Sequence, residues 1–154
     1  MIREFRGEYY FLSNFSTSRI EYDGYVYNNV EAAFHAQKNS SPEYKTMMQH
    51  QDSKNAKRKG RRVLLRKDWA QVKDQIMHDI VLAKFTQNPD LKAKLIATGD
   101  EYLLEGNTWH DNYWGVCLCN GSKCLDKVGK NKLGLILMKV RKELKNKENN
   151  NHDY

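Results

Sequence analysis

The stretch Val30-Glu31-Ala32-Ala33-Phe34-His35-Ala36-Gln37-Lys38 is the most informative segment of the chain, for its fold and for its chemistry. It is rich in helix formers and therefore predicts a helix. At roughly 100° per residue, Glu31, His35 and Lys38 project from one side of that helix, within about 40° of each other. A carboxylate there can act as a general base, and a partly desolvated lysine can act as a nucleophile. On spacing alone, an exposed face with ordinary salt bridges is the better explanation.

The residues before this helix predict short extended pieces, one of them a hairpin. Asp23-Gly24 is a strong hairpin turn signal, and it separates the apolar pieces 20–22 and 25–27. The run Tyr9-Tyr10-Phe11-Leu12 is interpreted as a further extended piece. We therefore expect a small hairpin near the N-terminus.

The rest of the chain predicts five more helices and one short strand. The helices are expected at residues 42 to about 50, in a basic segment capped by Asp52 or Ser53, at 69–85, at 89–98 and at 132–144, and the strand at 102–105. Asp68 is the expected N-cap of the third of these helices, and Gly99 fits the left-handed end of the fourth. The fold class is therefore α+β and predominantly α-helical. One domain is expected at residues 1–144, followed by a polar, disordered tail at 145–154.

Apolar residues indicate the buried face of several helices, among them the basic segment and the helix at 69–85. In the basic segment, Val63-Leu64-Leu65 is the only apolar cluster, and we expect it to pack against the core. In the helix at 69–85, the apolar residues at helical spacing are Val72, Ile76, Ile80 and Ala83.

Length and composition indicate a compact protein of the cytoplasm. The chain has 154 residues, without an apolar run near the roughly 18 residues that a membrane helix requires. Its first residues lack the apolar core of a signal peptide. We therefore expect a soluble, cytoplasmic protein without membrane contact, and the sequence does not indicate an oligomeric state.

The net charge of +7 is concentrated in one segment. Eight basic residues and no acidic one lie between Lys54 and Lys67, a concentrated positive field that favours phosphates. Arg58, Lys59 and Arg62 are the candidates for contact with phosphate or nucleic acid. A solvated basic helix face is the alternative interpretation.

The irregular stretch Glu105–Gly115 combines donors, acceptors and aromatic rings, a composition suited to gripping a planar ring and a sugar. Trp114 is a candidate for stacking on a base. Equally, the two tryptophans at 109 and 114 could be core anchors, with Asp111 as a turn residue.

Three cysteines occur in the spacing Cys117-x-Cys119-x4-Cys124, with His110 and Asp126 nearby. The set could bind zinc, but it lacks two clean Cys-x2-Cys pairs. Free thiols are the preferred interpretation, so no metal site is predicted, and no cofactor is demanded.

Sequence blocks distributed along nearly the whole chain resemble the NADAR domain. The blocks are Phe11-Leu12-Ser13-Asn14-Phe15, Gly24 to Tyr27, Val30-Glu31-Ala32-Ala33-Phe34, Lys38, Asp68-Trp69, Met77, Lys84-Phe85, Thr98-Gly99, Leu104-Glu105-Gly106, Trp114-Gly115, Asn131-x-Leu133-Gly134 and Leu137-Met138-x-x-Arg141. Their order and intervals make the resemblance more specific than any single motif.

The resemblance implies a compact, mainly helical N-glycosidase. It implies general acid/base duty for Glu31, and Lys38 matches a lysine that could form a Schiff base with an opened sugar. The binding residues that it implies are Asn14, Phe15, His35, Trp69, Asp111, Trp114 and Asn131. Many relatives have Gln where this chain has His35, and the cysteine-bearing insert before Asn131 also departs from the family pattern.

Three functions follow from the resemblance. The first is an N-glycosidase that acts on a phosphoribosylated aminopyrimidine of riboflavin synthesis. The second is a glycohydrolase that removes ADP-ribose from guanine in DNA or RNA, which the basic segment favours slightly. The third is a non-enzymatic module that binds ADP-ribose or nucleotides.

Overall fold

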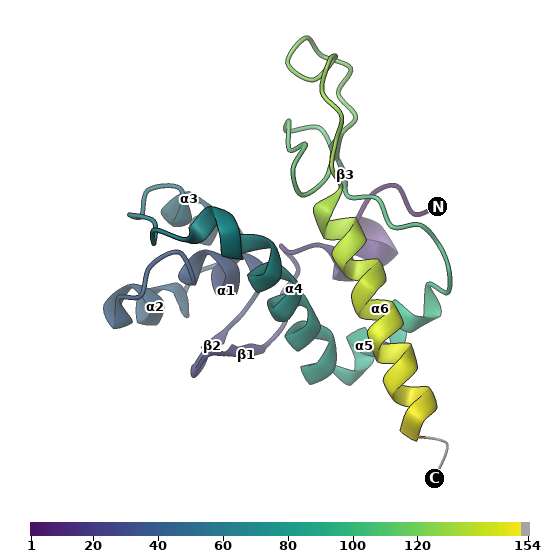
Figure 1. Ribbon diagram of the computed structural model, residues 1–154, viewed down its shortest axis with the longest axis horizontal. Coiled ribbons are helices and arrows are strands. Elements are labelled where there is room, and N and C mark those ends of the chain that lie inside the picture. The colour runs from purple at the N-terminus through teal and green to yellow at the C-terminus, as the bar shows by residue number, and fades with distance from the viewer. Residues whose placement is uncertain (152–154) are drawn as a thin grey trace. The chain divides into compact units, whose positions relative to one another are not determined.

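The computed structural model describes residues 1–151, and it confirms the α+β class with mostly helical structure (Figure 1). The elements in chain order are η1 (Gly7–Leu12), β1 (Ile20–Tyr22), β2 (Tyr25–Tyr27), α1 (Val30–Ala36), α2 (Pro42–Met48), α3 (Ser53–Gly60), α4 (Trp69–Gln87), α5 (Pro89–Ala97), β3 (Gly106–Asn107), β4 (Val116–Cys117) and α6 (Lys132–Asn151). Backbone contacts group the chain into two compact units. One is the continuous segment Asn14–Lys92, and the other combines Met1–Ser13 with the chain from Ala93 onward.

The expected hairpin opens the continuous unit. Strands β1 and β2 pair antiparallel, with Ile20 opposite Tyr27 and Tyr22 opposite Tyr25. The turn residues Asp23 and Gly24 have φ angles of 51° and 84°, a left-handed conformation that Asp tolerates and Gly adopts freely. The hairpin signal in the sequence is therefore confirmed.

Helix α1 is the centre of this unit, where it contacts α2, α3 and α4. Figure 1 shows α1 and α3 next to the first turns of α4. The Asn29 side chain caps α1 by accepting a hydrogen bond from the backbone N–H of Ala32 at 2.7 Å. Val30, Ala32, Ala33 and Ala36 are fully buried. Helical spacing alone had favoured an exposed, salt-bridged face for this helix, but most of its residues are buried in the core.

Helix α3 packs through small residues, not through the apolar cluster that we expected. It ends at Gly60, and Leu64 and Leu65 beyond it are 82% and 50% exposed. The buried residues are Ser53, Ala56 and Gly60, which recur at helical spacing. Small side chains allow close approach of the helix to α1, and this explains why the apolar cluster was the wrong signal.

Helix α4 is confirmed as a helix, but its cap and inner face differ from expectation. The Asp68 carboxylate makes no capping bond and instead accepts two hydrogen bonds from Arg66, at 2.6 and 2.9 Å. Of the predicted stripe only Ile80 is fully buried. The buried residues are Trp69, Met77, Ile80, Val81, Lys84 and Phe85. The face of the helix that packs against the core includes Lys84. A search for apolar residues at helical spacing cannot identify a face that contains a lysine.

The second unit begins with a 3-10 helix where an extended piece was expected. Gly7, the first residue of η1, has φ 57°, a left-handed conformation that glycine adopts freely. The strand expected at 102–105 is reduced to a single parallel bridge between Leu103 and Ile2. Further along, β3 and β4 pair in parallel, two residues each.

Helix α5 ends as predicted, with Gly99 at φ 65° just after it. The final helix was expected to end at Leu144, but it runs to Asn151. Lys145, in the part expected to be disordered, donates to the Gly99 carbonyl at 3.1 Å, and Arg141 donates to Thr98 Oγ1 at 2.9 Å. These contacts hold the helix to the rest of its unit on both sides of Leu144. Residues 152–154 of the expected tail lie outside the described residues.

The two longest helices are α4 and α6, with 19 and 20 residues. Within residues 1–151, every helix is too short or too polar to cross a lipid bilayer.

Candidate active site

The Glu31–His35 pair is held on the buried helix α1. Glu31 Oε2 and His35 Nε2 lie 2.9 Å apart, and their side chains are only 13% and 10% exposed. Since a carboxylate accepts hydrogen bonds, Nε2–H donates to Glu31. The other ring nitrogen, Nδ1, is buried against Gly60 and has no hydrogen-bond partner among residues 1–151. The pair is therefore a partly desolvated carboxylate oriented by an imidazole.

Asn14 contacts the first turn of α1, next to Glu31. Its backbone carbonyl accepts a hydrogen bond from the Glu31 N–H at 3.3 Å, and its side-chain amide points to the Met77 sulfur at 3.6 Å. Asn14 is 7% exposed, and its amide is directed at Met77 of α4, so only its backbone carbonyl contacts Glu31.

Lys38 lies beyond the end of α1, and not on the helix as its spacing suggested. The helix ends at Ala36, and the Lys38 N–H closes a tight turn on the His35 carbonyl at 3.2 Å. Lys38 Nζ donates to the Gly60 carbonyl at 3.0 Å. Burial lowers the pKa of Lys38, Glu31 opposes this shift, and the cations Arg61 and Lys73 add to it. The turn thus brings Lys38 within the electrostatic reach of Glu31, with a larger neutral fraction than an exposed lysine has.

Trp69 forms an aromatic wall beside Lys38. Lys38 Nζ lies 5.8 Å from the centroid of the Trp69 ring, and the ring lies 5.0 Å from that of Phe34. Trp69 is 7% exposed, so it lines the lysine environment and offers little open stacking surface.

A basic pocket of about 270 Å³ lies over α3. It is lined by Phe15, Lys54, Asn55, Lys57, Arg58 and Arg61. Lys57 Nζ lies 5.6 Å from the Phe15 ring centroid, and Arg61 is the same residue whose charge acts on Lys38. Of the three basic candidates from the sequence, only Arg58 belongs to this lining. Lys59 and Arg62 do not line the pocket.

Asp111 organises the loop of the second unit. Its Oδ1 accepts hydrogen bonds from the backbone N–H groups of Tyr113 and Trp114, at 3.0 and 2.9 Å. The Asn107 side chain in turn holds the Asp111 backbone at both its N–H and its carbonyl. The contacts support the turn-residue interpretation of Asp111. Trp114 is half-buried, with its ring edge-on to Tyr113 at 4.8 Å.

The Asn131 side chain makes hydrogen bonds to backbone groups of its own unit. It is 3% exposed, its Nδ2 donates to the Leu103 carbonyl at 2.9 Å, and its Oδ1 accepts from the Glu105 N–H at 3.0 Å. Its φ of 50° places it in the left-handed region just before α6. These contacts favour a structural role at the start of that helix over the orientation of a substrate hydroxyl.

The importance of two residues in the unit Asn14–Lys92 was not predicted from the sequence. Gly60 contacts the His35 ring through its bare α-carbon, and the only sequence signal was an isolated glycine in a run of helix formers. Lys84 is 1% exposed, it donates to Ser16 Oγ at 3.1 Å, and burial lowers its pKa to about 7. Its position in the resemblance blocks was visible, but its burial was not.

Comparison with known proteins gives consistent matches. The NADAR domain model matches residues 3–145. The N-glycosidase YbiA of Escherichia coli (strain K12) is 38% identical over 135 residues, which cover 86% of this chain and 79% of the relative. The riboflavin biosynthesis protein VVA0006 of Vibrio vulnificus is 35% identical over 137 residues, 87% of this chain and 35% of the relative.

A solved structure agrees with the sequence matches. The NMR structure of the E. coli protein YbiA aligns with a TM-score of 0.79 at 34% identity, over 96% of this chain and 87% of that one. The residues that the family model matches include α1, the Glu31–His35 pair and Lys38. The chain belongs to the NADAR domain family.

Proposed function

We propose that the protein is an N-glycosidase that hydrolyses the bond between ribose C1 and an exocyclic amine of a base, in a phosphoribosylated or ADP-ribosylated substrate. The observation that carries the proposal is the buried Glu31–His35 pair beside Lys38, whose pKa is lowered by burial. The names of the relatives, N-glycosidase and riboflavin biosynthesis protein, support the reaction class.

In the proposed reaction, Glu31 transfers protons and Lys38 is the nucleophile that attacks the sugar carbon C1. The C1–O4 bond breaks first, O4 takes up the proton of the base amine, and C1 becomes an imine carbon. Neutral Lys38 Nζ then adds to C1, the Glu31 carboxylate relays the protons that Nζ loses to the base amine, and the C1–N bond breaks to leave an imine on Lys38. Water then adds to the resulting imine, and Lys38 leaves as the free aldehyde forms. Direct attack of water on C1, with Glu31 as general base, is the route without a covalent intermediate.

The basic pocket supports a phosphorylated substrate. Its cations Lys54, Lys57, Arg58 and Arg61 can neutralise a ribose phosphate or diphosphate, and Phe15 provides an apolar contact at its edge. Arg61, which lines the pocket, also lowers the pKa of Lys38 through its positive charge, so the pocket and Lys38 are electrostatically coupled.

Two substrates compete. A phosphoribosylated aminopyrimidine is supported by the name of the Vibrio relative. ADP-ribosylated guanine in DNA or RNA is supported by the exposure of the basic segment, in which Lys54, Arg58, Arg61 and Arg62 all face solvent. A module that only binds ADP-ribose or nucleotides is the non-enzymatic alternative.

The test offers both substrates to the purified protein and follows base release by mass spectrometry. We expect turnover of one of them, with a loss of at least about a hundredfold in Glu31→Gln. The matched control is Glu21→Gln, on the hairpin, which should turn over at the wild-type rate. Turnover of neither substrate, with binding retained, would favour the binding module.

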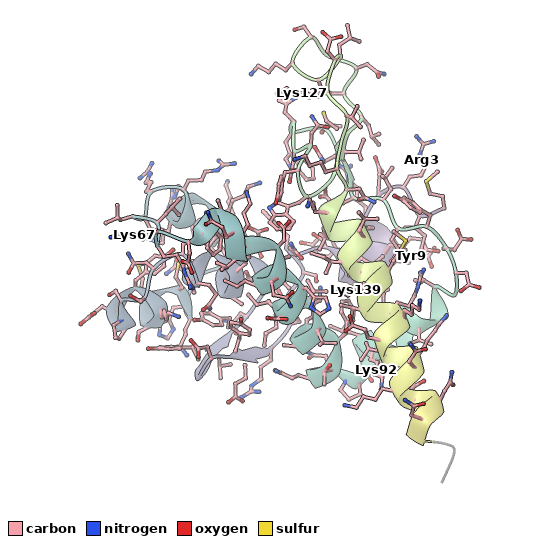
Figure 2. The ribbon with its side chains drawn as sticks, viewed as in Figure 1. Arg3, Tyr9, Lys67, Lys92, Lys127 and Lys139 are labelled. Atoms are coloured by element: carbon pink, nitrogen blue, oxygen red, sulfur yellow. The ribbon has the colours of Figure 1, made fainter. Side chains whose placement is uncertain are left out.

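Borohydride trapping examines the covalent route separately. Under turnover, peptide mapping should locate a reduced adduct on Lys38 that is absent in Lys38→Met. Lys67→Met is the control, because Lys67 is exposed on the loop between α3 and α4 (Figure 2). Active enzyme without an adduct would leave the direct attack of water as the mechanism.

A further inference from the structure

Four side chains with metal-binding atoms meet in the irregular segment of the second unit. His110 Nδ1 lies 3.3 Å from Cys124 Sγ, 3.6 Å from Cys119 Sγ and 3.8 Å from Cys117 Sγ. All four atoms lie within 4.8 Å of one another. The spacing in sequence had favoured free thiols, but the fold brings the three thiols and one imidazole to a common point.

The nitrogen–sulfur separations match those expected between ligands at the corners of a tetrahedron. With Zn–S near 2.3 Å and Zn–N near 2.0–2.1 Å, tetrahedral angles place sulfur and nitrogen roughly 3.5 Å apart. The three nitrogen–sulfur distances, 3.3, 3.6 and 3.8 Å, bracket that value. The nitrogen–sulfur distances are therefore compatible with one metal ion among the four atoms, and the sulfurs, all within 4.8 Å, can close around it.

The surroundings of the cluster donate hydrogen bonds to sulfur. The Asn112 side-chain amide points to Cys124 Sγ at 3.3 Å, and the Gly121 N–H points to Cys119 Sγ at 3.4 Å. N–H donors of this kind stabilise the negative charge of metal-bound thiolates and orient them. Paired disulfides explain the cluster less well, because three thiols cannot all pair.

We propose that His110, Cys117, Cys119 and Cys124 bind one structural zinc ion. Three sulfurs and one imidazole nitrogen form a donor set that selects zinc over the hard cations magnesium and calcium. The four ligands fill a tetrahedral shell, so the ion has no open position for a substrate and its role is structural. On binding, each coordinating thiol releases its proton to solvent and binds as the thiolate.

The ion would order the loop that contains Trp114. Asn112 joins the two, because its Oδ1 accepts the Cys117 N–H at 2.9 Å while its amide contacts Cys124. The backbone carbonyl of Asn112 also accepts the Lys130 N–H at 2.9 Å, which ties the end of the segment back to its start. Figure 2 shows Lys127 on this segment. The zinc site does not depend on the proposed glycosidase activity.

The direct test measures metal content. The full chain, purified under reducing conditions with zinc and then desalted, should retain about one zinc ion per chain by elemental analysis. His110→Gln and Cys119→Ser should each lower that content severalfold or abolish it. His50→Gln is the matched control, because His50 is exposed on another unit, and it should keep the wild-type content.

Two measurements on the wild type remain decisive if a variant fails to fold. Cobalt substituted for zinc should give the intense absorption of thiolate ligation together with the visible bands of tetrahedral cobalt. The three thiols should react with a disulfide reagent roughly tenfold or more slowly with zinc than after chelation. Folded wild type that retains no zinc, a cobalt spectrum without thiolate bands, or thiols equally reactive in both states would each overturn the proposal.

Discussion

The His35 ring lies directly against the α-carbon of Gly60. A β-carbon at position 60 would approach Nδ1 of the ring to 2.2 Å and its Cγ to 2.4 Å, far inside van der Waals contact. The Gly60 carbonyl also accepts a hydrogen bond from Lys38 Nζ. One residue therefore fixes the positions of both the imidazole and the lysine.

We expect Gly60→Ala to displace the His35 ring and to lower both stability and turnover. The overpacking should lower the free energy of unfolding by about 1–3 kcal/mol, as measured by urea denaturation. It should also reduce turnover, because the imidazole can no longer hold Glu31 at 2.9 Å.

A double variant separates the clash from other effects of the substitution. His35→Ala removes the ring that a β-carbon would meet, so Gly60→Ala should cost much less stability in that background than in the wild type. Equal costs in the two backgrounds would show that the His35 contact is not the reason for glycine at this position.

His35→Gln should keep most of the activity, while His35→Leu should lose it. A glutamine amide N–H can still donate to the Glu31 carboxylate, whereas leucine leaves that carboxylate without its donor. The measurement is the pH–rate profile of each variant. Loss of activity in both variants to the same extent would assign the imidazole a role that an amide cannot fill.

Lys84→Met should remove a pH dependence of stability. Burial lowers the pKa of Lys84 from 10.5 to about 7, so between these values the unfolded chain binds more protons than the folded one. The free energy of unfolding therefore rises with pH across this window, with a slope of at most about 1.4 kcal/mol per unit from this group. Below about pH 7 the cost of burying the charge is fully present.

The measurement is the free energy of unfolding of wild type and variant between pH 7 and 10, compared as a difference. Methionine should stabilise the protein most at the low end of this range. Lys67→Met, at an exposed position, should leave the slope unchanged. A slope in Lys84→Met equal to that of the wild type would contradict the assignment.

Asn29→Ala should destabilise α1 by about 1 kcal/mol or more, because it removes the cap of a helix whose N–H groups are buried. Asn29→Asp should cost less. Its carboxylate still accepts the Ala32 N–H, but it cannot donate to the Gln51 carbonyl as the amide does at 3.1 Å. Chemical denaturation of the three proteins gives the order. An alanine variant as stable as the wild type would show that the cap contributes little.

Local signals predicted the parts of the fold that local chemistry determines. The Asp23-Gly24 turn, the start of α2 at residue 42 and Gly99 after α5 all depend on signals within a few residues, and each is found where expected. The inner faces of α3 and α4 were not predicted correctly, because close helix approach through Ala56 and Gly60 and the burial of Lys84 depend on distant partners.

The same distinction applies to the site. Helical spacing placed Glu31 next to His35, as the 2.9 Å contact confirms, but it placed Lys38 on a helix that ends two residues earlier. Lys38 reaches the site through a turn and a contact with Gly60, 22 residues away in sequence. The cysteines show the opposite case, because their spacing looked irregular while the folded loop brings them together.

The unit Asn14–Lys92 is one uninterrupted piece of chain, whereas the other unit joins Met1–Ser13 to the chain from Ala93 onward. During synthesis, every residue of the Glu31–Lys38 site has therefore left the ribosome before the C-terminal partners of the first residues exist. Ile2 must wait for Leu103 before its bridge can form. A nascent chain arrested far enough beyond Lys92 for that unit to clear the ribosome should already resist proteolysis around α1, while its first residues remain open to cleavage until Leu103 has emerged.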